Sequence, residues 1–91
     1  MNILDITKLL SRLQIAKTNI DYAVRLLDDG EKKEDAKTQQ VEVDKLLEME
    51  LGEPEETLGL IINYLESNEA QVSELNESAI LIALSYSAGQ N

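Results

Sequence analysis

Hydrophobic residues recur at alternating intervals of three and four along the first third of the chain. They are Ile6, Leu9, Leu13, Ala16, Ile20, Ala23 and Leu27. This spacing places them on one side of an α-helix, and Leu10 and Val24 widen the stripe in the way that helix bundles require. We therefore predict a long helix over about residues 3–28. The sequence "DDG" follows it, and Gly30 can take the left-handed conformation that often ends a helix.

The next segment, "EKKEDAKTQQ", has one apolar residue in ten. Such a composition predicts a solvated connection over 29–37, and it leaves open whether the next helix starts inside the segment. A second helix is predicted over about 38–51. Its apolar residues Val43, Leu46, Leu47 and Leu51 share one face.

Gly52 and Pro54 then interrupt the pattern, since Gly suits the end of a helix and Pro suits a first turn. A third helix is predicted over about 54–67, with Leu58, Ile61, Ile62 and Leu65 turned inward. Because only three residues separate this segment from the previous one, a single kinked helix is the alternative.

The sequence "NEAQ" at 68–71 has the spacing of a capping box, so a fourth helix is predicted over about 69–88. The 3,4 spacing continues there in Val72, Leu75, Ala79, Ile82 and Tyr86. The sequence thus predicts an all-α fold, a single domain over 1–91 built as a small antiparallel bundle of three to four helices.

Six consecutive apolar residues, Ala79 to Leu84, make this last helix apolar on two sides. A helix of that kind needs two partners, and a small domain supplies only one of them readily. We therefore expect the second partner to be another chain and the protein to be oligomeric; the alternative is a helix packed centrally in its own bundle. Leu60 and Tyr64 form a smaller pair expected to point outward. The expected interface residues are Ile80, Leu81, Leu84, Ala88, Leu60 and Tyr64.

The net charge of −10 argues against binding to nucleic acid or to an anionic membrane. It is unevenly distributed, because residues 1–27 carry four basic and two acidic side chains and residues 28–91 carry four basic and sixteen acidic ones. An ordinary solvated helix explains this asymmetry, and the alternative is a first helix that pairs with acidic neighbours, within the bundle or across a dimer. Arg12 and Lys17 flank its apolar stripe where such pairs form.

The chain has no cysteine and no histidine, which excludes disulfides and thiolate chemistry. It also lacks a Gly-rich phosphate loop, an apolar run long enough to cross a membrane and a signal-peptide core. Glutamates with metal-site spacing, Glu31/Glu34 and Glu66/Glu69, are better explained as solvated faces. We expect no catalytic residue, cofactor or metal, and a cytoplasmic protein.

These features favour a non-enzymatic helical interaction module of the adaptor, chaperone or inhibitor type, whose apolar last helix associates with itself or with another protein. Three alternatives remain. The first is an acidic inhibitor of the phage type that mimics nucleic acid, although lysines interrupt its acidic track. The others are a ligand-sequestering helical oligomer and, less favoured, a metal-dependent all-α hydrolase.

Overall fold

The structure is a computed structural model, and it describes residues 2–49 and 54–89. Nearly all of these residues belong to three helices, α1 (Ile3–Leu26), α2 (Glu31–Met49) and α3 (Pro54–Gly89). The all-α prediction is confirmed over the described residues. The molecule measures 50 × 24 × 19 Å, because α3 alone has 36 residues and a helix rises about 1.5 Å per residue.

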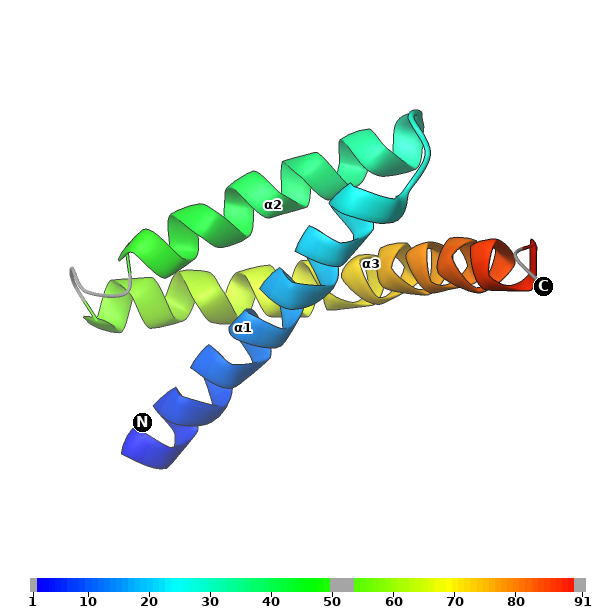
Figure 1. Ribbon diagram of the computed structural model, residues 1–91. Coiled ribbons are helices and arrows are strands. Elements are labelled where there is room, and N and C mark those ends of the chain that lie inside the picture. Colours follow the sequence, from blue (N-terminus) through cyan, green and yellow to red (C-terminus); the bar gives the residue numbers. More distant parts are fainter. Residues whose placement is uncertain (1, 50–53, 90–91) are drawn as a thin grey trace.

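The three helices pack against one another (Figure 1). α1 crosses α3, and α2 runs back alongside both. α1 and α3 run in broadly the same direction, and α2 runs opposite to them. The N-terminal end of α1 and the C-terminal end of α3 diverge from the rest of the assembly (Figure 1). Each of these ends consequently has fewer neighbours than the middle of its helix.

The core consists of two clusters of buried side chains. The larger is built by all three helices and contains Leu13, Ala16, Ile20, Val43, Leu46, Ile61, Tyr64, Leu65 and Val72. The smaller joins the end of α1 to the beginning of α2 and the middle of α3, and contains Ala23, Leu27, Ala36, Leu75 and Ala79. Alanines in this second cluster let the helix backbones approach closely.

α1 follows its predicted pattern. Asn2 caps it, since its Oδ1 accepts a hydrogen bond from the Asp5 amide at 2.9 Å. The predicted stripe is buried from Leu13 onward, whereas Ile6 and Leu9 are only partly covered because the helix diverges from α3 there. Gly30, between α1 and α2, has φ +147°, a conformation that side-chain-bearing residues rarely adopt.

The prediction of a solvated connection over 29–37 is wrong for most of its length, because α2 begins at Glu31. Although this segment is highly polar, its one apolar residue, Ala36, is fully buried in the smaller cluster. Ala36, Gln39, Val43 and Leu46 continue the 3,4 spacing as the buried side of α2. The charged residues occupy the solvent side, so one alanine is enough to anchor the first turns.

The prediction of separate helices over 54–67 and 69–88 is also wrong, because α3 is continuous. Asn68 does not cap a helix; its Nδ2 donates to the Tyr64 carbonyl at 2.9 Å within α3. The 3,4 spacing from Ile61 and Leu65 passes through Asn68 to Val72 without a change of phase, so one helix buries both apolar segments.

The predicted boundary between α2 and α3 involves residues 50–53, which lie outside the described range. α3 begins at Pro54 and runs opposite to α2, so these are two helices and not one kinked helix (Figure 1). The buried Thr57 ties them together, donating from Oγ1 to the Met49 carbonyl at 3.1 Å. No helix of the described residues has an apolar stretch long enough to cross a membrane.

Candidate functional site

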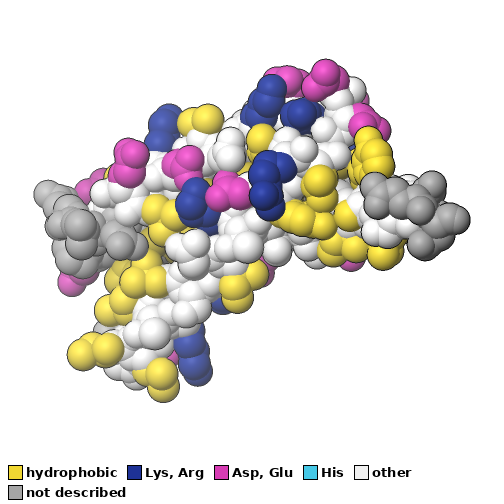
Figure 2. All heavy atoms as spheres, viewed as in Figure 1, with side chains coloured by type: hydrophobic (Ala, Val, Ile, Leu, Met, Phe, Trp, Pro, Cys, Tyr) yellow, Lys and Arg dark blue, Asp and Glu magenta, His cyan; other side chains and the backbone are white. Residues whose placement is uncertain are grey.

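The largest exposed hydrophobic side chains of α3 lie in its C-terminal part. Ile80, Leu81 and Leu84 are exposed by 41, 65 and 60%. We call these three residues the α3 apolar face. Figure 2 shows hydrophobic side chains gathered along the part of α3 that extends beyond the other helices. The expected outward orientation of Ile80, Leu81 and Leu84 is therefore observed, and the central packing considered for this run is not.

One side of this helix segment is covered by the chain itself. Ala79 is fully buried, and Ile82 packs against the smaller core cluster together with Tyr22 and Leu26 of α1. Tyr86 was expected to continue this covered side, but it is 65% exposed because α3 extends past α1 at this point. The chain thus covers one side and leaves the α3 apolar face to solvent.

The other expected interface residues have different positions. Leu60 is 40% exposed, as an outward residue should be. The outward orientation expected for Tyr64 is wrong, because its side chain is buried in the larger cluster and hydrogen-bonded there. The side chain of Ala88 lies outside the described residues.

Tyr64 belongs to a polar layer inside the apolar core, which the sequence reasoning missed. Its Oη donates to Gln39 Oε1 of α2 at 2.6 Å. Gln39 Nε2 in turn donates to Asn68 Oδ1 at 3.2 Å and to Gln71 Oε1 at 3.1 Å. This layer fixes the register of α2 against α3, because a shift of either helix would leave buried polar atoms without partners.

Burial raises the pKa of Tyr64 to about 12, and the nearby charge of Glu42 acts in the same direction. An unfolded tyrosine titrates near pH 10. Because the folded pKa is the higher one, the contribution of the neutral hydroxyl to stability is complete below about pH 10 and is lost as the pH rises through about 12. We expect the free energy of unfolding to fall more steeply over this interval in the wild type than in Tyr64→Phe. Denaturant titrations at fixed pH, with tyrosinate absorbance recorded in parallel, would measure this; equal slopes would contradict it.

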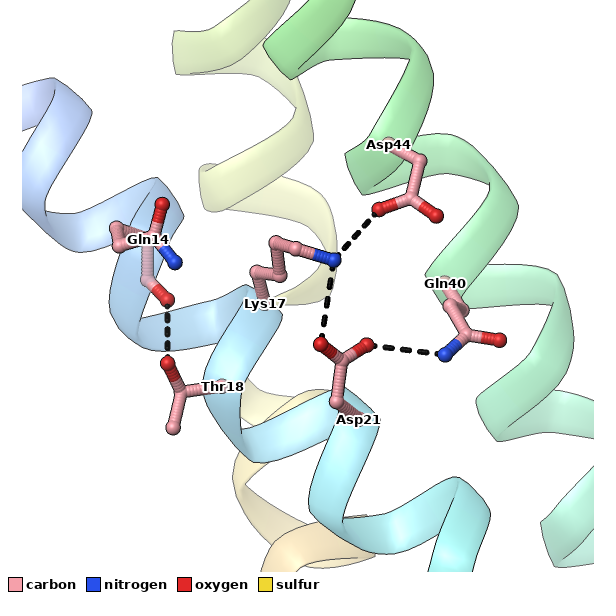
Figure 3. Close-up of polar contacts among 6 residues, drawn as sticks. All are labelled: Gln14, Lys17, Thr18, Asp21, Gln40 and Asp44. Atoms are coloured by element: carbon pink, nitrogen blue, oxygen red, sulfur yellow. Dashed lines mark hydrogen bonds and ion pairs between the residues drawn. The ribbon is translucent and has the colours of Figure 1, made fainter.

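The basic side chains of α1 that the sequence singled out are paired within the chain. Arg12 forms a two-pronged contact with Glu69, with its Nε and Nη2 donating at 3.2 and 2.9 Å. Lys17 Nζ lies 2.9 Å from Asp44 and 3.2 Å from Asp21 (Figure 3). Arg12 and Lys17 are therefore paired within the bundle, which was the alternative to an ordinary solvated helix.

Hydrogen bonds shift the pKa values in this group (Figure 3). The bonds to Asp44 and Asp21 raise the pKa of Lys17, with the bond to Asp44 having the larger effect. The bond from Gln40 lowers the pKa of Asp21, and Lys17 adds to this effect. Lys17 thus connects α1 to α2, and Arg12 connects α1 to α3. The charge of the chain is acidic because it has 18 acidic and 8 basic side chains.

A groove between α2 and α3 adjoins the α3 apolar face. Its volume is about 360 Å³, and Lys32 Nζ donates across it to Ser78 Oγ at 3.1 Å. Its remaining lining residues are Asp35, Gln71, Glu74, Leu75, Glu77 and Leu81. Leu81 thus borders a groove with more acidic than basic side chains, and it belongs to a stretch of sequence, 78–91, that has no charged residue of its own.

Among the described residues, no group of three or more acidic side chains could hold a metal ion. Glu31 and Glu34 lie in the first turn of α2, and Glu69 pairs with Arg12. The described arrangement therefore contains a candidate docking surface and offers no assembled set of metal ligands.

Comparisons of the chain with protein-family models, with curated proteins and with solved structures found no match.

Proposed function

We propose that the protein is a non-enzymatic helical interaction module that docks through the α3 apolar face. The observation that carries the proposal is the combination of three exposed aliphatic side chains with a helix segment free of charge. Contiguous exposed apolar surface costs solubility and is characteristic of binding sites. Burying a leucine side chain provides about 1.5 to 3 kcal/mol, so this face can contribute substantially to a complex.

The rest of the molecule acts as a rigid support for this face. Ala79 and Ile82 anchor the preceding and following turns to the smaller core cluster, which fixes the rotation of α3 about its axis. Leu81 and Leu84 consequently project to the same side of a helix that is already formed before a partner binds. A preformed face of this kind loses less conformational entropy when it associates.

The double variant Leu81→Glu/Leu84→Glu tests the proposal. We expect it to abolish the complexes of the wild-type chain, with affinity lowered by about 100-fold or more, because two buried leucines per chain are replaced by charges. The measurements are light scattering across a dilution series and affinity capture from the cells that produce the protein. They detect association with itself and with other proteins, respectively.

Ile15→Glu is the matched control. Ile15 of α1 is 60% exposed, as Leu84 is, so the variant introduces the same charge at an equally exposed aliphatic position elsewhere. It should leave every complex intact. If the double variant and the wild type form the same complexes in both measurements, the α3 apolar face is not a docking surface.

A further inference from the structure

We infer that the partner of the α3 apolar face is the same face of a second copy of this chain, with the two α3 helices antiparallel about a two-fold axis. This inference rests on the proposed function and names its partner. Most soluble homo-oligomers are closed and symmetric, and a two-fold dimer buries the same patch on both subunits.

The charge distribution favours a partner that is itself acidic, as a second copy of this chain is. Two molecules with a net charge of −10 repel each other, so they can associate only where their local charge is low. Residues 78–91 contain no charged side chain, whereas the adjoining groove contains Asp35, Glu74 and Glu77 together with Lys32, which donates to Ser78. A basic partner would be drawn to that acidic groove. An apolar surface placed on the uncharged end of α3 is instead suited to a partner that is itself acidic.

The position of the acidic residues favours the antiparallel arrangement. When two helices pair antiparallel about a point between Leu81 and Leu84, each Leu81 lies opposite the Leu84 of the other copy. Each Glu77 then lies opposite the uncharged segment beyond Leu84. The acidic bodies of the two subunits lie at opposite ends of the paired helices. Parallel pairing would place Glu77 opposite Glu77 and both acidic bodies side by side.

The helical end of α3 also gains from such a pairing. Its own chain leaves the side chains of Leu81 and Leu84 exposed to water, although Ile82 on the opposite side packs against the smaller core cluster. Ser78, Ala83 and Ser85 flank the apolar residues, and their small side chains allow two backbones to approach closely. Each copy thus supplies the covering surface that the other lacks.

A spin label on Ser73→Cys would measure the arrangement, because the chain has no cysteine of its own and Ser73 is exposed on α3 outside the paired segment. In the antiparallel dimer the two labels are separated by about 28 Å along the helix axes, given a rise of about 1.5 Å per residue. In a parallel dimer they are separated by about 10 Å, the distance between packed helices. We expect a pulsed electron resonance distance near 30 Å, which disappears in Leu81→Glu/Leu84→Glu.

The same dimer should become tighter as salt is added, because screening weakens the repulsion between like charges. A distance below about 20 Å would overturn the antiparallel pairing. Association that weakens with salt would overturn the argument that a second acidic copy is the partner. A monomer at all concentrations would overturn self-association. If another protein were then captured through Leu81 and Leu84, the proposed function would stand without this inference; if neither complex formed, both would fail.

Discussion

Truncating Leu13 to alanine is expected to lower the free energy of unfolding by about 3 kcal/mol. Leu13 is fully buried in the larger cluster, between α2 residues such as Val43 and α3 residues such as Ile61. A cavity at a point where three helices meet cannot close by the movement of one of them. A domain of this size has a total stability of about 5 to 14 kcal/mol, so the loss would be a large part of it.

Urea denaturation followed by circular dichroism would measure this loss, with Ile15→Ala as the control. Ile15 has the same kind of side chain on the same helix but is mostly exposed, and its truncation should change the free energy by less than about 0.5 kcal/mol. A loss below about 1 kcal/mol for Leu13→Ala would mean that the three helices do not enclose this side chain as described.

The strongest sequence signal, the stripe of α1, predicted both the helix and its buried face. From Leu13 to Leu27 every residue of the stripe is buried. The signal is strong because α1 packs against two helices and therefore needs a wide, regular apolar side. Where α1 diverges from α3, at Ile6 and Leu9, the same pattern continues although the burial does not. Periodicity shows which side of a helix is apolar, and it does not show where the neighbouring helix ends.

Polar residues on the inward side of α2 and α3 contributed to the two errors in the fold; Gln39 is buried and Asn68 is partly buried. Gln39 and Asn68 each occupy a position of the 3,4 spacing that an apolar residue would normally fill. The low apolar content of 31–40 predicted a late start for α2, and the capping-box spacing of "NEAQ" at 68–71 predicted a break in α3. In the structure these two side chains satisfy each other across the helix interface, so the interruptions in the apolar pattern mark a contact and not a boundary.

The α3 apolar face was located from the sequence because six apolar residues in succession must cover more than one side of a helix. The position of Tyr64 could not be found in this way. It was predicted to point outward together with Leu60, yet its hydroxyl is held by Gln39, a residue 25 positions earlier in another helix. The burial of an isolated tyrosine depends on whether a distant chain segment supplies an acceptor, which spacing along one helix does not reveal.

Replacing Gln39 with leucine is expected to lower the free energy of unfolding by about 2 kcal/mol, even though leucine is the more hydrophobic residue. The substitution removes the acceptor of the Tyr64 hydroxyl and the donor to Asn68 and Gln71. Asn68 and Gln71 can bond water instead, but the buried Tyr64 hydroxyl is left without an acceptor, at a cost of about 1 to 3 kcal/mol. Gln40→Leu is the matched control, because Gln40 bonds the partly exposed Asp21 and its loss should cost less than 1 kcal/mol.

The double variant Gln39→Leu/Tyr64→Phe distinguishes this explanation from a simple change in packing. The double variant removes the Tyr64 hydroxyl together with its Gln39 acceptor, which are joined by a 2.6 Å hydrogen bond. No buried hydroxyl is then left without a partner. The double variant should therefore lose less stability than the sum of the two single variants, by about 1 kcal/mol, in a cycle measured by urea denaturation. Additive losses would mean that Gln39 and Tyr64 act independently and that the polar layer does not set the register of α2 against α3.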